Sequence, residues 1–167
     1  MNNIEIFEGM EFRAFDDTDV KTFTPIFRRA FDNDSQMHLN VCGGPDGYKD
    51  GRFLKQWYLA NRNGAFAVYK KNTPIGGINV FVDLQKKEGF LGNIFIDTDY
   101  EDSGIGALCW KFIEYKFPQI KTWFTETPKY STRNHHFYVN KCGFKIWKIE
   151  NPKERDQGQY FLEKIMY

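Results

Sequence analysis

Two glycines separated by one residue, Gly104 and Gly106, stand between an apolar run and a helical pattern of apolar residues. A strand that leads through a glycine turn into a helix presents backbone N–H groups, which can bind phosphates. Segment 90–117 is therefore the first candidate for contact with a cofactor. It lacks both the G-x-x-x-x-G-K-[ST] loop and the third glycine of a dinucleotide fingerprint, and Asp99, Glu101 and Asp102 bring negative charge beside it. Two interpretations stay open here: a structural turn, or a pyrophosphate site built mainly from backbone amides.

A second group of chemically capable residues lies in segment 131–144, STRNHHFYVNKCGF. Tyr138 follows a phenylalanine that the helical spacing turns toward a core, and its hydroxyl needs a polar partner. A packed aromatic and a functional tyrosine are both consistent with this position. His135 and His136 are adjacent, so on a helix they point in different directions and joint binding of a metal ion is not expected.

The elements that must position these groups follow from apolar periodicity and turn residues. Residues 1–10 could add a strand or an arm. No linker, repeat or low-complexity tract divides the chain, so a single domain over residues 1–167 is expected. The predicted order is a strand at 11–15, a helix from about 20 to 31, a loop at 32–51, a helix around 53–58, a hairpin at 65–69 and 75–82, a strand at 90–97, a helix at 105–117, a strand at 122–127, a helix at 131–141, and strands at 144–149 and 160–166.

Composition excludes several classes of protein. The formal charge is +1 over 167 residues, which offers no broad field for nucleic acid. The three cysteines contain no C-x-x-C pair, so neither a disulfide framework nor a metal site is indicated. No apolar run approaches the roughly 20 residues of a membrane helix, and no secretory signal pattern is visible. We therefore expect a cytoplasmic protein without membrane or metal partners.

Taken together, the two groups resemble the GCN5-related N-acetyltransferase (GNAT) superfamily, and the resemblance covers Phe12 to Tyr167. Residues 12–20 look like that family's first strand and capped helix. Segment 94–107, with Ile94-Phe95-Ile96, Tyr100 and Ser103-Gly104-Ile105-Gly106-Ala107, is similar to its acetyl-CoA motif R/Q-x-x-G-x-G/A. Phe137-Tyr138, Lys141 and Gly143-Phe144 resemble its late motif L-Y-x-x-x-G-F.

The resemblance implies an α+β, three-layer acyl-CoA N-acyltransferase fold. Its sheet would be mixed but mostly antiparallel, with about seven strands flanked by helices, and splayed between the strands at 90–97 and 121–127. The implied activity is transfer of an acetyl group from acetyl-CoA to a primary amine of a small molecule or peptide, by direct attack in a ternary complex. A non-catalytic module that binds acyl-CoA or another ligand is the alternative. The resemblance also leaves a homodimer open.

The resemblance further implies roles for individual residues. Tyr138 falls on the usual general acid, and Glu126 is the first candidate for a general base, ahead of Asp97, with water-mediated proton loss as the alternative. Acceptor neighbours would be Arg28, Phe31, Trp57 and Glu126, together with His38. Acetyl-CoA would contact Ile94, Phe95, Ile96, Glu101, Asp102, Ser103, Gly104, Ile105, Gly106, Ala107, Ser131, Asn134, Tyr138 and Lys141.

Two departures from the family pattern concern the cofactor site. Glu101 stands where the motif usually has Arg or Gln, so an anion replaces a cation or amide beside the pyrophosphate. Either cofactor affinity is weaker, or other basic groups compensate, with Lys111, Lys141 and Lys145 as candidates. In the late motif, Ser131 replaces the common Asn and Asn134 replaces a small residue.

Overall fold

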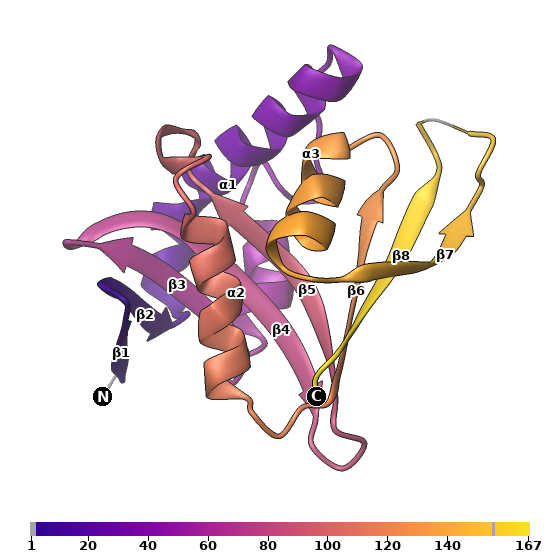
Figure 1. Ribbon diagram of the computed structural model, residues 1–167. Coiled ribbons are helices and arrows are strands. Elements are labelled where there is room, and N and C mark those ends of the chain that lie inside the picture. The colour runs from indigo at the N-terminus through magenta and orange to yellow at the C-terminus, as the bar shows by residue number, and fades with distance from the viewer. Residues whose placement is uncertain (1–2, 155) are drawn as a thin grey trace.

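The computed structural model, which describes residues 3–154 and 156–167, is built around one sheet of eight strands in the order β1-β2-β3-β4-β5-β6-β8-β7 (Figure 1). Every neighbouring pair is antiparallel except β5 and β6, which run parallel. The strands are β1 (Ile4–Phe7), β2 (Met10–Ala14), β3 (Ala65–Lys70), β4 (Thr73–Asp83), β5 (Glu88–Ile96), β6 (Thr122–Pro128), β7 (Lys145–Glu150) and β8 (Gln159–Ile165).

Helices cover both faces of the sheet and give a three-layer arrangement. On one face lie α2 (Ile105–Lys116) and the short α3 (Thr132–His136), which continues as the π-helical turn η3 (Phe137–Lys141) (Figure 1). On the other face lie α1 (Asp17–Leu39) and the π-helical turn η1 (Leu54–Leu59). A single 3₁₀ turn, η2 (Thr98–Tyr100), connects β5 to the loop before α2.

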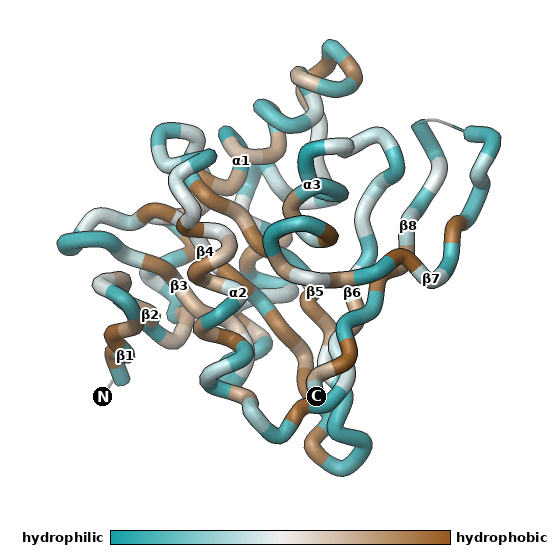
Figure 2. Tube along the Cα trace, in the orientation of Figure 1, coloured by the Kyte–Doolittle hydropathy of each residue, from teal (hydrophilic) through white to brown (hydrophobic). Residues whose placement is uncertain are grey.

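The alternation of side chains along the strands produces two hydrophobic clusters. Phe66 and Val68 of β3 belong to the cluster under α2, whereas Ala65 and Ala67 belong to the cluster under α1. Figure 2 shows hydrophobic residues along the central strands, where helices cover them, and hydrophilic residues at the outer end of the link between β7 and β8. The predicted α+β fold with a mixed sheet is confirmed; the sheet has eight strands rather than about seven because residues 4–7 form β1. Residues 1 and 2 of the predicted N-terminal arm lie outside the described residues.

The first helix is longer than predicted, and the expectation of a loop over residues 32–51 is wrong for residues 32–39. Asp16 caps the start of α1 in a capping box with Asp19, and Asn40, in the left-handed conformation with φ +57°, ends it. The polar residues of the added turns hydrogen-bond to α3 and to the loop before α2. These tertiary contacts override the weak helix propensity of the Asn- and Asp-rich stretch.

The predicted splay of the sheet is confirmed. Pairing between β5 and β6 is confined to three positions, from Glu88 opposite Thr122 to Phe90 opposite Phe124. Beyond that point the strands separate, and η3 lies next to the opening. The predicted single helix over 131–141 is instead α3 followed by η3, because the hydrogen-bonding pattern widens from the α-helical to the π-helical form at Phe137.

Candidate functional site

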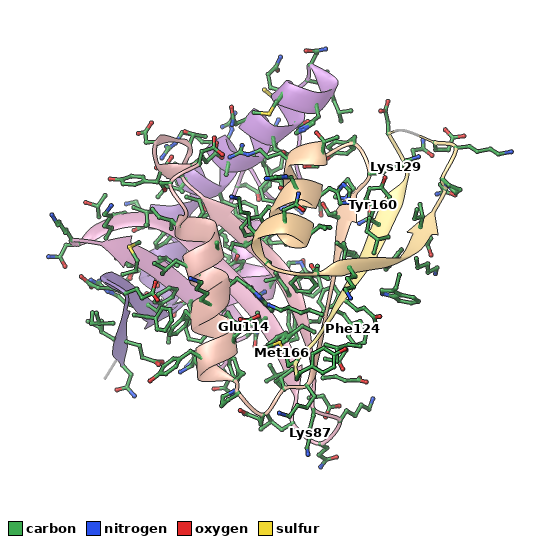
Figure 3. The ribbon with its side chains drawn as sticks, viewed as in Figure 1. Lys87, Glu114, Phe124, Lys129, Tyr160 and Met166 are labelled. Atoms are coloured by element: carbon green, nitrogen blue, oxygen red, sulfur yellow. The ribbon has the colours of Figure 1, made fainter. Side chains whose placement is uncertain are left out.

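A cavity of about 590 Å³ opens where β5 ends, between the N-terminus of α2 and the α3–η3 segment. Figure 3 places Lys87, just before β5, at the opposite end of the sheet. A bulge precedes the cavity: Gly92 is the extra residue between the pairs Asn79–Asn93 and Val80–Leu91. The bulge shifts the alternation, so that Ile94 and Ile96 face the α2 side while Phe95 faces α1. All three line the cavity, and their contact with acetyl-CoA stays a prediction.

The glycine turn forms the next wall. Gly104 has φ +81°, a conformation that glycine adopts without strain, and a Cβ there would meet no heavy atom within 4 Å. The helix begins at Ile105, and its first repeating bond runs from the Leu108 N–H to the Gly104 carbonyl. The N–H groups of the first turn therefore have no acceptor within the helix and are available for an anion at the cavity wall.

Gly106 has a different function in the turn. A Cβ on Gly106 would lie 3.0 Å from the ring of Phe137, so a side chain at this position would have to push that ring away by a few tenths of an ångström. Phe137 lines the cavity on the η3 side. The second glycine of the motif therefore lies where the two motif segments come together.

Glu101, which stands where the family motif has a cation or amide, is not an isolated negative charge. Its carboxylate lies 3.0 Å from the Nη2 of Arg133 and accepts a hydrogen bond of 3.1 Å from the Asn33 side chain. Burial raises the pKa of Glu101 above its usual value, and the hydrogen bond with Arg133 opposes that rise. Of the basic residues expected to compensate, Lys141 lines the cavity, whereas Lys111 and Lys145 do not. Arg133, which was not among them, lines it as well.

The C-terminal half of α1 forms the remaining wall through Phe31 and Asp34. Asp34 accepts hydrogen bonds of 3.1 Å from the hydroxyl of Ser131, and His38 lies 3.2 Å from the hydroxyl of Thr132. Arg29 donates two hydrogen bonds, of 3.2 and 2.8 Å, to the Asp97 carboxylate. Asp97, the second candidate for a general base, is therefore held by a guanidinium.

Tyr138 lies behind the cavity wall rather than in it, with 7% of its surface exposed. Burial raises the pKa of its hydroxyl well above 10, while a side-chain hydrogen bond with Thr125 lowers it by less. Thr125 itself donates a hydrogen bond of 2.8 Å to the carbonyl of Leu91 on β5. The strands β5 and β6 separate beyond Phe90 and Phe124, so Leu91 and Thr125 lie at the apex of the opening between them. The contacts of Thr125 therefore link the Tyr138 hydroxyl to this apex.

The predicted site residues separate into two sets. Those that the structure brings together around the cavity are Phe31, Ile94, Phe95, Ile96, Glu101, Asp102, Gly104, Ile105, Gly106, Ala107, Asn134 and Lys141. The predicted residues outside its lining are Arg28, His38, Trp57, Asp97, Ser103, Glu126, Ser131 and Tyr138. The lining also contains residues that were not predicted for the site: Ala30, Asp34, Tyr100, Arg133, His136 and Phe137.

The residues outside the cavity have identifiable environments. Ser131 is fully buried under Asp34, and Arg28 lies 3.6 Å from Asp32 in an ion pair on the surface of α1. Trp57 is 43% exposed and packs its ring edge-on against Phe81. Glu126 is exposed on the sheet face opposite Thr125, because neighbouring residues of a strand point to opposite sides.

Residues 3–154 and 156–167 hold no cluster of three or more His, Cys, Asp or Glu arranged to bind a metal ion. None of the helices in this part of the chain has the length and apolar character needed to span a membrane.

Comparisons with known proteins agree with the fold. A sequence model described as the acetyltransferase (GNAT) family matches residues 25–144, well over half of the chain. One curated relative, the uncharacterized protein YrkN of Bacillus subtilis (strain 168), is 39% identical over 77 residues. The alignment covers 46% of this chain and 42% of the relative, so the chain spans less than half the length of that relative.

Solved structures give matches along nearly the whole chain. The ribosomal-protein-S18-alanine N-acetyltransferase from Escherichia coli has a TM-score of 0.67 at 20% identity, over 99% of this chain and 94% of that chain. The PaiA N-acetyltransferase from Thermoplasma acidophilum, solved in complex with coenzyme A, has a TM-score of 0.70 at 16% identity, over 94% and 99%. An acetyltransferase from Thermus thermophilus has a TM-score of 0.74 at 12% identity, over 99% and 100%. At such low identities, these matches show a common fold.

Proposed function

Because the chain belongs to the acetyltransferase (GNAT) family, we propose that it transfers an acetyl group from acetyl-CoA to a primary amine of a small molecule or peptide. One observation carries the proposal: the glycine turn at the start of α2 and the opening between β5 and β6 meet at a single cavity. A long ligand with an anionic group in its middle and an extended arm that can hydrogen-bond to a strand edge matches both features.

The residues of the cavity fit acetyl-CoA in chemistry and size. The free amides of residues 105–107, at the positive end of the α2 dipole, suit a pyrophosphate. Beyond Phe90 the edge of β5 that faces β6 is no longer paired, so the backbone of Ile94 and Ile96 can bond an extended arm as if it were an added strand. Ligand pockets commonly enclose about 300–1,000 Å³, and the cavity of about 590 Å³ lies in that range.

Acetyl-CoA supplies a thioester that is already activated toward amines. The chain would hold it so that the amine reaches the carbonyl carbon in the correct orientation, which can account for several kcal/mol of the barrier. Tyr138 would donate its proton to the departing thiolate sulfur. Its hydroxyl is connected through Thr125 to the apex of the strand opening, and its raised pKa keeps it protonated at neutral pH.

For the base that removes the amine proton, we retain Glu126 as the first candidate and a water-mediated route as the alternative. Glu126 is exposed on β6, on the sheet face away from α2, from which an amine could approach. Asp97 is a weaker candidate because two hydrogen bonds from Arg29 occupy its carboxylate. Arg28, Phe31 and Trp57 stay as proposed acceptor neighbours, and Phe31 has the additional support of lining the cavity.

A non-catalytic acyl-CoA-binding module is the second candidate, favoured by the anion at position 101. The ion pair between Glu101 and Arg133 weakens the case for this candidate, because the negative charge is balanced within the site.

A cytoplasmic location agrees with three free cysteines, of which Cys109 and Cys142 are buried.

The test combines acetyl-CoA titration with a panel of amines and detection of the free thiol of CoA. The panel includes polyamines, aminoglycosides, amino acids and peptides with free N-termini or lysines. Acetyl-CoA binding with thiol release on at least one amine supports the enzyme. Binding without thiol release on any amine supports the module, and no binding at millimolar acetyl-CoA excludes both.

A further inference from the structure

The cavity is lined by charges of both signs from opposite sides. Arg133 and Lys141, from α3 and η3, supply positive charge, whereas Glu101 and Asp102 of the loop before α2 supply negative charge, as does Asp34 of α1. In the family motif that the sequence resembles, a cation or amide stands at the position of Glu101. Here the loop carries the anion, and the cation closest to it comes from across the cavity.

Arg133 is held in a defined place at this wall. The hydroxyl of Ser131 caps α3 through the Asn134 N–H at 3.4 Å and is itself bound to Asp34 of α1. This anchors the first turn of α3, where Arg133 is the second residue. Its side chain is 27% exposed, so the guanidinium is partly shielded from water but still reaches the cavity.

Glu101 is the partner that fixes the guanidinium. Its side chain is 15% exposed, and two donors, Arg133 Nη2 at 3.0 Å and Asn33 Nδ2 at 3.1 Å, hold the same carboxylate oxygen. A guanidinium carries five N–H donors in a planar fork. Among the described residues, Glu101 is the only ion-pair partner of Arg133, so the remaining donors can serve a second anion with two oxygens.

We propose that Arg133 binds the pyrophosphate of acetyl-CoA and that Glu101 is a positioning residue that holds the guanidinium against the glycine turn. This inference rests on the proposed function. The phosphate then lies between a fixed guanidinium on the α3 side and the free amides at the start of α2. The anion at position 101 thereby strengthens the site instead of weakening it, because it fixes the cation before the ligand arrives.

The test is calorimetric titration at fixed ionic strength with two ligands, acetyl-CoA and S-acetylpantetheine, which lacks the pyrophosphate. Arg133→Gln is expected to weaken acetyl-CoA binding by about ten- to a hundredfold, as expected for the loss of a hydrogen bond to a charged group. Its affinity for S-acetylpantetheine should stay within about twofold of the unaltered chain. Arg133→Lys keeps the charge but loses the planar fork of donors. Its affinity for acetyl-CoA should lie between those of the unaltered chain and Arg133→Gln.

The role of Glu101 is read from a double-mutant cycle. Glu101→Gln alone should weaken acetyl-CoA binding by about three- to tenfold, and its effect should vanish in the Arg133→Gln background. The matched control is Arg52→Gln, which removes another ion-paired arginine, 2.8 Å from Asp50 and outside the cavity lining. It should leave both affinities unchanged. Circular dichroism and the thermal midpoint without ligand confirm that each variant is folded.

Several results would overturn the inference. An unchanged acetyl-CoA affinity in Arg133→Gln, or an equal loss for both ligands, would remove Arg133 from the phosphate site. Tighter binding of acetyl-CoA by Glu101→Gln would show that Glu101 competes with the phosphate instead of positioning Arg133. If the unaltered chain binds no acetyl-CoA, the proposed function fails as well. Binding by the unaltered chain with no effect of Arg133→Gln overturns the inference alone.

Discussion

The hydroxyl of Thr125 on β6 donates a hydrogen bond of 2.8 Å to the carbonyl of Leu91 on β5, one position beyond the last registered pair of these parallel strands. This bond joins the two strands at the point where they part. We predict that Thr125→Val, which keeps the shape of the side chain, lowers the free energy of unfolding by about 1–3 kcal/mol because a buried carbonyl loses its partner. Urea unfolding measures the loss.

Thr127 provides a matched control on the same strand and the same face. It is equally buried, but its hydroxyl has no hydrogen-bond partner among the described residues. Thr127→Val should therefore leave stability unchanged or raise it. Equal destabilisation by both substitutions would show that the bond to Leu91 is not what stabilises the opening.

Gly104 allows the backbone conformation of the anion-binding turn to be tested separately from packing. Gly104→Ala should lower stability by about 1 kcal/mol, because φ +81° is unfavourable for a side chain while the space around it is open. It should also weaken acetyl-CoA binding by shifting the first amides of α2. Calorimetric titration and urea unfolding measure the two effects.

Gly9 is the control for Gly104, since it has the same φ of +81° and the same open surroundings in the turn between β1 and β2. Gly9→Ala should cost similar stability without altering acetyl-CoA affinity. Loss of affinity in Gly9→Ala would mean that the binding effect reflects general destabilisation. Retained affinity in Gly104→Ala would place the phosphate away from this turn.

If Tyr138 is the general acid, removing its hydroxyl should lower turnover without changing the binding of acetyl-CoA. Tyr138→Phe should reduce kcat by about a hundredfold or more, a typical contribution of a positioned acid, with little change in the Kd of acetyl-CoA. Steady-state rates and calorimetry on the same preparation check both values. An unchanged kcat would remove Tyr138 from the chemistry.

The raised pKa of Tyr138 also predicts how kcat should depend on pH. An acid must be protonated to donate, and burial moves the pKa of this hydroxyl above its usual value of 10.0. Tyr138 should therefore stay active as the pH rises through about 10, and kcat should show no loss from this group below that pH. A decline in kcat below pH 10 that Tyr138→Phe abolishes would contradict the raised pKa of Tyr138, because it would assign that titration to this hydroxyl.

Glu126 can be tested against a neighbouring carboxylate on the same face of the sheet. Glu126→Gln should lower kcat/KM for the amine by about a hundredfold while leaving acetyl-CoA binding intact. Glu163, opposite Phe124 on β8, is the control, and Glu163→Gln should have little effect. Similar rates for Glu126→Gln and the unaltered chain would favour the water-mediated route.

Local patterns were sufficient to predict the features that sit within one stretch of chain. The apolar run at 90–96, the glycine turn and the stripe from Ile105 to Ile113 correspond to β5, the loop and α2, because strand and helix periodicities depend on neighbouring residues. The resemblance carried by Gly104, Gly106 and Tyr138 led to the correct family. The separation of β5 from β6 was expected from that resemblance and could not be read from periodicity.

Features that depend on distant partners could not be predicted in this way. Residues 32–39 look like a loop by composition, yet contacts of Asn33 and Asp34 with Glu101 and Ser131 hold them in α1. The Arg133–Glu101 pair joins residues 32 positions apart, so neither sequence segment reveals that the charge at Glu101 is balanced. The sequence does show an arginine, Arg133, within segment 131–144. Its role depends on its short distance to Glu101, which the sequence does not give.

A crystal structure of the chain with acetyl-CoA tests the central claim most directly, through the distance from the Tyr138 hydroxyl to the thioester sulfur. We predict that the pyrophosphate lies at residues 101–107, that the pantetheine arm lies between β5 and β6, and that the sulfur is within reach of Tyr138 directly or through one water. Acetyl-CoA bound outside this cavity, or with its sulfur turned away from Tyr138, would contradict the account.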